Sequence, residues 1–221
     1  IPRLESGDRL NRVEFERRYD ACSDIKKAEL IEGVVYVASP TRHLSHGKQH
    51  GWIVTWLGHF QARNPLLELS DNGTVRMDLD NEPQPDALLR IPERLGGRSR
   101  LDADGYLDGA PEFIAEVASS SASYDTGPKK NAYRRNGVRE YLIWRVLDHA
   151  IDWYVLEKGN YEHLAPSADG LLRSQIYPGL WLDGDALLAG RMDRVLEVLD
   201  QGLVSPEHRS LRARLEAGGE R

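Results

Sequence analysis

The sequence has little of the chemistry that marks exported or membrane proteins. It contains a single cysteine, Cys22, which cannot form an intramolecular disulfide and is too few for a thiolate zinc site. No apolar run approaches the roughly 20 residues that a membrane-spanning helix requires, and the first ten residues lack an apolar signal core. We therefore expect a cytoplasmic protein with no membrane contact, in which any metal is held by oxygen or imidazole.

Positive charge is also in short supply. The 29 Lys and Arg residues are outnumbered by 35 Asp and Glu residues, so the formal net charge is −6. This balance excludes a uniformly basic surface that coats nucleic acid by charge alone, and any such contact must be local. Seven arginines offer a local basic rim, although a solvated face is the expected role of most of them: Arg90, Arg94, Arg98, Arg100, Arg134, Arg135 and Arg139.

Apolar residues are sufficient for an ordinary core. Of the 221 residues, 40% are hydrophobic and 29% are charged, unlike a disordered acidic chain. We expect one domain over residues 1–190 and a helical extension over residues 191–221.

The hydrophobic periodicity alternates between helical and strand patterns, which predicts an α/β protein of mixed α+β character. Helices are expected at residues 11–21, 46–62, 129–136, 192–199 and 207–215. Strands are expected at 67–70, 74–79, 86–91, 112–118 and 140–146, the last of which closes the sheet. Hairpins are expected around Glu32-Gly33, with Pro40 ending the second strand, and around Gly159-Asn160. Residues 90–109 lack periodicity and predict an exposed loop.

Three segments carry charged residues that stand out from this pattern. Asp86 opens a strand directly after a proline, which suits a first strand position because it lacks an amide hydrogen. Glu116 interrupts an apolar strand, where a lone carboxylate is costly unless a cation or a proton compensates it. Asp125, Lys129 and Lys130 stand where the chain enters a helix. Each residue alone has an ordinary structural explanation. Their joint occurrence in this order favours a catalytic role over a structural one.

Two strand carboxylates, waters and a substrate phosphate satisfy the octahedral oxygen coordination of magnesium. A neighbouring lysine can orient or deprotonate the attacking water and offset phosphate charge. The combination of residue types therefore suits phosphodiester hydrolysis.

The segments Q-P-D, F-I-A-E-V, Y-D-T-G-P-K and R-E-Y-L-I-W, in this order, resemble the Uma-two family of restriction endonucleases, a branch of the PD-(D/E)xK nuclease superfamily. The resemblance runs from about Phe15 to Y-P-G-L-W-L-D. It implies a restriction-endonuclease-like mixed β-sheet flanked by helices, with extra β-hairpins. It also implies an endonuclease that uses Mg²⁺ or Mn²⁺ to hydrolyse nucleic acid, with DNA as the leading substrate.

The resemblance also assigns roles to single residues. Asp86 and Glu116 correspond to the metal-binding acids, and the superfamily lysine would have moved from the glutamate strand to the following helix. Lys129 is our choice for it, because Lys130 falls at a variable position of the pattern Y-D-x-G-x-K. Asp125 belongs to the same pattern and is a secondary candidate.

Glu29 and His46 match an upstream acid and a helix histidine of the family. Each also has a simpler explanation, since Glu29 can pair across its hairpin and His46 can bond locally at a helix start. The sequence departs from the family where V-A-S-S-S replaces a leucine-serine-proline run, a change that could displace Lys129. Arg145 replaces a frequent acid, and nothing in the sequence explains it.

A second hypothesis is a catalytically inactive nuclease scaffold that serves as a binding or regulatory module. The acidic composition and the lack of a recognisable DNA-reading domain motivate it. A homodimer is also predicted, from the C-terminal amphipathic helices and from tryptophans at Trp52, Trp56, Trp153 and Trp181. Core packing is the expected role of most of these tryptophans.

Overall fold

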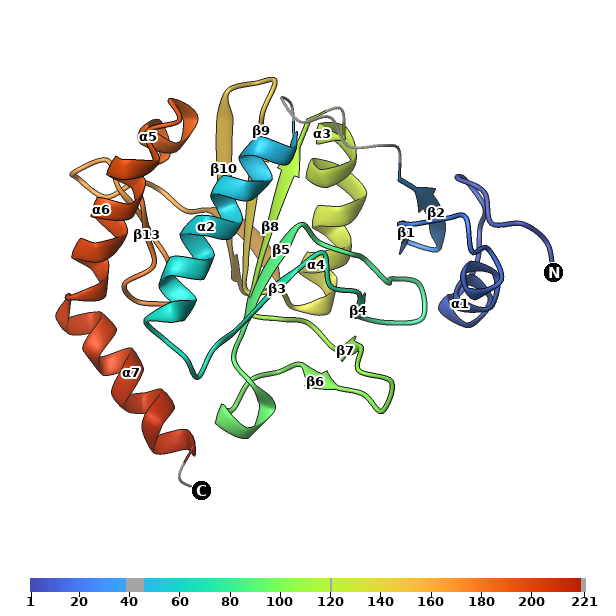
Figure 1. Ribbon diagram of the computed structural model, residues 1–221, viewed down its shortest axis with the longest axis horizontal. Coiled ribbons are helices and arrows are strands. Elements are labelled where there is room, and N and C mark those ends of the chain that lie inside the picture. The colour runs from blue at the N-terminus through green and yellow to red at the C-terminus, as the bar shows by residue number, and fades with distance from the viewer. Residues whose placement is uncertain (39–45, 120, 220–221) are drawn as a thin grey trace.

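The computed structural model describes residues 1–38, 46–119 and 121–219. A six-stranded sheet lies at its centre (Figure 1). In spatial order its strands are β11 (Asn160–His163), β10 (Ala150–Glu157), β9 (Glu140–Arg145), β8 (Phe113–Ala118), β5 (Ala87–Arg90) and β3 (Glu68–Asp71). Within this sheet β8 and β9 run parallel and the other neighbours are antiparallel. The prediction of a mixed sheet in an α/β fold is therefore confirmed.

One face of the sheet is covered by the long helix that the periodicity predicted and by the C-terminal helices. These are α2 (Lys48–Ala62), α5 (Gly184–Leu188), α6 (Met192–Leu203) and α7 (Pro206–Gly219). Trp56 and Trp153 are fully buried here, with Val195 of α6 and Leu211 of α7 in the same core. The two C-terminal helices thus bury apolar side chains against the sheet layer, while the predicted domain boundary at residue 190 stays a prediction.

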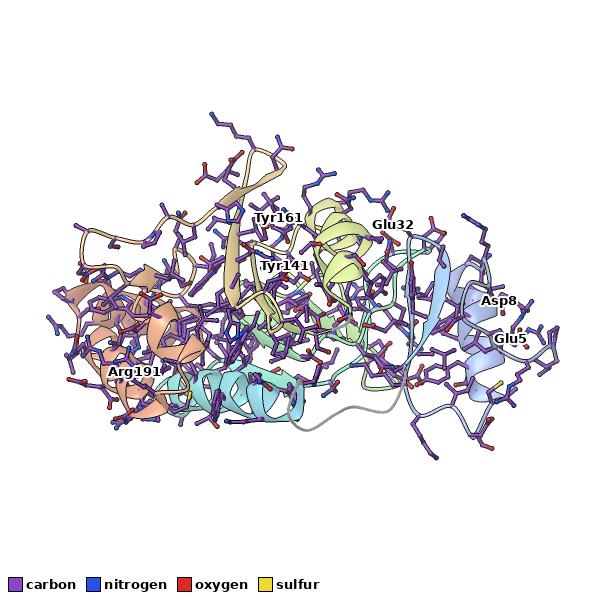
Figure 2. All side chains as sticks on the ribbon, turned by 90° about the horizontal axis from the view of Figure 1, so that it is seen from above. Glu5, Asp8, Glu32, Tyr141, Tyr161 and Arg191 are labelled. Carbon is purple, nitrogen blue, oxygen red and sulfur yellow. The ribbon has the colours of Figure 1, made fainter. Side chains whose placement is uncertain are left out.

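The other face is covered by a broken helix that joins β8 to β9. It consists of α3 (Ala122–Tyr124), the π-helical turn η3 (Asp125–Lys129) and α4 (Lys130–Asn136). Figure 2 shows Tyr141 and Tyr161 next to α4 and Arg191 in the separate layer of α5 and α6. The helix starts earlier than predicted, because the serine-rich segment already turns. Gly137 ends it at φ 85°, as the sequence predicted.

A small N-terminal lobe lies at the opposite end of the molecule from α5 to α7 (Figure 1). It contains α1 (Arg12–Asp20) and the predicted hairpin of β1 (Ala28–Ile31) and β2 (Val34–Val37). The hairpin turns at Glu32 and Gly33, both in the left-handed region at φ 53° and 72°. Glu32 pairs with Arg135 of α4 at 3.0 Å, which ties the lobe to the main body. Pro40 lies outside the described residues.

Two strand predictions need correction. The predicted strand at residues 74–79 shrinks to β4 (Val75–Arg76), which pairs with β7 rather than with the main sheet. The chain after β9 continues the sheet instead of closing it, because β10 and β11 add two antiparallel strands. Their turn lies at Lys158 and Gly159, one position before the predicted one.

The segment 90–109, predicted to be an exposed loop, carries regular structure. It contains η2 (Glu93–Leu95), β6 (Arg100–Leu101) and β7 (Leu107–Asp108). Strands too short to show a period of two escape a periodicity argument. A further short hairpin of β12 (Leu172–Arg173) and β13 (Trp181–Leu182) leads into α5. None of the helices in the described ranges has the length and apolar composition needed to cross a bilayer.

Two helical glycines, one on α2 and one on α6, test how tightly the helices on this face of the sheet pack. A Cβ added at Gly202 of α6 would lie 2.3 Å from the carbonyl oxygen of Gly179, whereas one added at Gly51 of α2 would meet no atom within 4 Å. We expect Gly202→Ala to lower the free energy of unfolding by about 2–3 kcal/mol, because the backbone at Gly179 or Gly202 must shift to make room for the added methyl group. Gly51→Ala should raise it by about 0.5–1 kcal/mol. Urea unfolding measures both, and an unchanged stability of Gly202→Ala would contradict this packing.

Candidate active site

The register of β5 on β8 places two acidic side chains side by side. Asp86 directly precedes β5, and its backbone N–H donates to Glu116 Oε2 at 3.3 Å. In return, the N–H of Val117 donates to Asp86 Oδ2 at 2.8 Å. Both carboxylates are buried, with exposed fractions of 5% for Asp86 and 3% for Glu116. The structure thus brings together the two acids that the sequence singled out on separate strands.

Lys129 completes the centre from the broken helix that joins β8 to β9. Its Nζ lies 2.7 Å from Glu116 Oε1 and 3.0 Å from Glu29 Oε1, and Asp125 Oδ1 is 3.9 Å away. The π-helical turn η3 orients both Asp125 and Lys129 toward the sheet, and such turns are frequent at functional sites. The unusual V-A-S-S-S segment does not displace the lysine here. The neighbouring Lys130 instead packs on the ring of Tyr154.

Glu29 contributes to this centre rather than pairing across its hairpin. Its register partner on β2 is Tyr36, which offers no cation. Glu29 Oε1 instead accepts from the backbone N–H of Gln84 at 2.7 Å and from Lys129. The N-terminal lobe therefore supplies one acid to the site on the main sheet.

Two histidines at the start of α2 also contact Asp86. His46 Nε2 lies 3.1 Å from Asp86 Oδ2, so the expected purely local bond is not what this side chain makes. His50, four residues later on the same helical face, lies 2.9 Å from the carbonyl oxygen of Asp86 and 3.0 Å from Asp71 Oδ1. Lys27 Nζ lies 3.9 Å from Asp86 Oδ1.

Sequence reasoning missed His50, Lys27 and Tyr133, whose hydroxyl donates to Glu116 Oε1 at 2.8 Å. Each lies two or four residues from a site residue that the sequence did predict. His50 follows His46 by four residues on a predicted helix, and Tyr133 follows Lys129 by four. Lys27 precedes Glu29 by two residues, the spacing that places side chains on the same side of a strand.

The electrostatics of the centre are dominated by burial and by an excess of acids. Burial raises the pKa of Glu116 to about 8; the charge of Lys129 opposes this shift, and the like charge of Asp86 adds to it. Burial also raises the pKa of Asp125. Asp86 differs, since burial is outweighed by the hydrogen bond and charge of His46 and by two lysine charges, which hold its pKa at about 2. Burial opposes protonation of Lys129, but the surrounding carboxylates raise its pKa well above the ordinary value.

The donor set fits a hard divalent cation that takes few ligands from the protein. Within Asp86 and Glu116, Oδ1 and Oε2 are the less engaged carboxylate oxygens, since Oδ2 and Oε1 each have two close partners. No group of three or more His, Cys, Asp and Glu side chains suited to a metal occurs in the described part of the chain. Magnesium is commonly bound by one or two carboxylates, waters and substrate phosphates, so a two-acid site is compatible with it. A cation would also offset the excess of buried negative charge.

The predicted basic rim is smaller than the sequence suggested. Arg90 is 5% exposed at the end of β5 and pairs with Glu68 at 2.7 Å, so it belongs to no surface rim. Arg100 pairs with Asp108, and Arg135 pairs with Glu32. Three of the seven arginines are therefore engaged with acids.

Glu82, a buried acid outside the centre that bridges to Leu30 of the lobe, gives a pH prediction. Burial raises the pKa of Glu82 to about 8, and the nearby carboxyl group of Glu16 adds to the shift. Because the unfolded pKa is lower, the folded state binds the extra proton, and stability falls as pH rises from about 4.5 to 8. Glu82→Gln removes this dependence.

We expect the Glu82→Gln protein to gain on the order of 2 kcal/mol relative to wild type between about pH 5 and pH 9. Urea unfolding at both pH values measures this difference. The exposed Glu157→Gln serves as a control that should not change it. A stability difference between Glu82→Gln and wild type that is independent of pH would contradict the assignment.

Comparison with known proteins places this geometry in a family. The profile of the Uma2 family, described as "Putative restriction endonuclease", matches residues 13–185. The chain belongs to this family. No curated protein matches the sequence. Among solved structures, the Uma2 chain is similar to one described as a "putative nuclease belonging to DUF820 from Anabaena variabilis ATCC 29413", at 14% identity and a TM-score of 0.51, covering 78% of this chain and 90% of that one. The family and the restriction-endonuclease-like fold predicted from the sequence are thereby confirmed.

Proposed function

We propose that this Uma2 protein is a metal-dependent endonuclease that hydrolyses phosphodiester bonds in nucleic acid, with DNA as its substrate. The observation that carries the proposal is the convergence of Asp86, Glu116 and Lys129 from two strands and a helix onto one buried point. Family membership and the nuclease description of the structural neighbour support it. Mg²⁺ or Mn²⁺ is the proposed cofactor, held by Asp86 and Glu116.

The side chains divide the work of hydrolysis. The cation, when bound, would act as a Lewis acid on the phosphate and lower the pKa of an attacking water. Lys129 stays protonated, so it donates a hydrogen bond to the water or to a phosphate oxygen and does not accept a proton. His46 and the N–H of Val117 hold Asp86 Oδ2, which fixes the orientation of the other oxygen. Glu29 and Asp125 keep the Lys129 ammonium in place.

A cleavage assay tests the proposal. Purified protein is incubated with supercoiled plasmid, linear duplex DNA, single-stranded DNA and RNA, with Mg²⁺, with Mn²⁺ or with EDTA. We expect cleavage of DNA that requires the divalent ion. If all substrates stay intact with both metals, the proposal is wrong, and the non-catalytic scaffold hypothesis takes its place.

The homodimer stays a prediction. Three of the four tryptophans proposed for its interface pack within the chain instead. Trp56 and Trp153 are fully buried, and Trp52 stacks on Trp144 within the chain. Light scattering at several protein concentrations measures the mass directly. A mass of about 50 kDa, twice the 25.0 kDa of the chain, is the expected result.

A further inference from the structure

A cavity of about 410 Å³ opens on the sheet beside the candidate active site. Its floor is formed by β3 and β5, and its outer wall by the segment that carries β6 and β7. Six of its lining residues matter for the argument: Ser70, Thr74, Leu88, Arg90, Leu101 and Tyr106. The volume lies within the range of roughly 300–1,000 Å³ that is typical of small-ligand sites.

The cavity and the acidic centre share one face of one strand. Asp86, Leu88 and Arg90 follow one another at a period of two, so their side chains project on the same side of β5. Two residues of strand span about 7 Å, which is the separation between the Asp86 backbone and the start of the cavity floor. Ser70, the register partner of Leu88 on β3, widens the floor at the same level. A nucleotide whose phosphate lies at Asp86 therefore has its base within reach of the cavity.

The cavity combines a buried fixed donor with apolar walls. Arg90 is 5% exposed, and its Nε and Nη1 are held by Glu68 at 2.7 Å and by the carbonyl oxygen of Ser99 at 2.8 Å. Its Nη2 makes no hydrogen bond to any residue in the described ranges. A guanidinium that is fixed by two partners and keeps a third nitrogen free is suited to an acceptor on a planar ligand. Leu88 and Leu101 supply apolar surface.

An aromatic ring stands at the edge of the same cavity. Tyr106 is 39% exposed, and Arg76 packs on its ring at 4.2 Å from the centroid. The Asp102 carboxylate accepts from the N–H of Tyr106 at 2.9 Å, which holds this part of the hairpin in a defined turn. Tyrosine rings provide stacking surfaces for nucleobases of any sequence.

We infer that this cavity receives a nucleobase that is rotated out of the base stack next to the cleaved phosphodiester bond. The inference rests on the proposed nuclease function and adds to it a recognition site. Extrahelical bases are bound in pockets that stack on their faces and hydrogen-bond to their edges. Tyr106 supplies stacking, and Arg90, with the hydroxyls of Ser70 and Thr74, supplies the edge contacts.

Two variants test the cavity without altering the acidic centre. Tyr106→Ala removes the ring, and Ser70→Trp fills the space. Tyr19→Ala on α1 and Ser210→Trp on α7 are matched controls that lie outside the cavity lining. Each protein is assayed on a DNA duplex and on bis(4-nitrophenyl) phosphate, a diester that carries no nucleobase. We expect both cavity variants to cleave DNA about tenfold more slowly or worse, corresponding to the loss of base stacking.

Hydrolysis of the small diester should stay within about twofold of wild type in both variants, because only nucleobase binding is lost. Equal losses on both substrates, or no loss on DNA, would overturn the inference while leaving the nuclease proposal intact. A second measurement detects base binding even if the protein cleaves no DNA. Duplexes with 2-aminopurine at successive positions are mixed with each protein, with Ca²⁺ in place of Mg²⁺, and the emission is recorded.

A rise in 2-aminopurine emission at one position with wild type, absent with both cavity variants, is the expected result. If it occurs while wild type cleaves nothing, the nuclease proposal fails and the base-binding site stands. If wild type produces no emission change at any position, the inference is wrong.

Discussion

Replacing Glu116 with glutamine is expected to abolish DNA cleavage, with a loss of roughly a thousandfold or more in rate, or about 4 kcal/mol of barrier. The amide keeps the shape of the side chain but cannot ionise, so it removes a proposed anionic ligand of the cation and weakens the contact with Lys129 at 2.7 Å. Asp86→Asn should have the same effect. A nicking assay under excess enzyme measures the rate, and circular dichroism checks the fold.

Glu140→Gln is the matched control for this experiment. Glu140 is also a fully buried strand glutamate of the same sheet, but its carboxylate accepts from Ser174 and from the N–H groups of Gln175 and Ile176, away from the centre. We expect this variant to lose some stability, on the order of 1–3 kcal/mol, while cleaving at a near wild-type rate below its melting temperature. Full cleavage by Glu116→Gln would remove the basis for the assigned site.

The second large effect concerns Lys129 and the stability of the folded chain. Lys129→Met leaves Glu29, Glu116 and Asp125 buried without their shared cation. Removing one partner of a buried ion pair typically costs about 3–5 kcal/mol, and we expect a loss of this size near pH 8. The loss should shrink near pH 5, because protonation neutralises carboxylates whose folded pKa values then lie above their unfolded values. The same variant should lose cleavage.

Lys130→Met is the neighbouring control. Lys130 lies over the Tyr154 ring and makes no ion pair with the acids of the centre in the described residues. Its replacement should cost less than about 1 kcal/mol and leave cleavage unchanged. Urea unfolding at the two pH values compares the proteins. Equal effects of the two lysine variants, or a Lys129→Met loss that does not depend on pH, would contradict the charge arrangement described here.

The two central acids were predictable for different reasons: Glu116 broke a strong local rule, whereas Asp86 was singled out by its place in the ordered set with Glu116 and Lys129. Glu116 interrupts a fully buried strand, and Asp86 follows a proline at a strand start. Family resemblance supplied the choice of Lys129 over Lys130, since both sit at the same helix entry. The distances to Glu116 separate them in the structure: Lys129 reaches it, and Lys130 points to Tyr154.

Features that depend on tertiary packing were not predictable from the sequence. The spacing of four residues places His50 on the same helical face as His46, but only the packing of α2 at the start of β5 shows that this face meets Asp86. Arg90 was grouped with surface arginines, although its burial follows from the position of β5 and from its pairing with Glu68 on β3. The cavity likewise requires the segment of β6 and β7 to lie against β3. Strands of two residues are too short to show a periodic pattern, so the sequence did not predict this arrangement.

The most direct test of the account is a calorimetric titration of Mn²⁺ into wild type, Asp86→Asn and Glu116→Gln, each checked for folding. We expect one binding site in wild type that is lost in both variants, because each acid is one of the two proposed protein ligands. The same titration is repeated with an uncleavable phosphorothioate duplex present, since a substrate phosphate completes the coordination. Absence of binding in wild type under both conditions, or binding that survives both substitutions, would contradict the claim that Asp86 and Glu116 hold the metal.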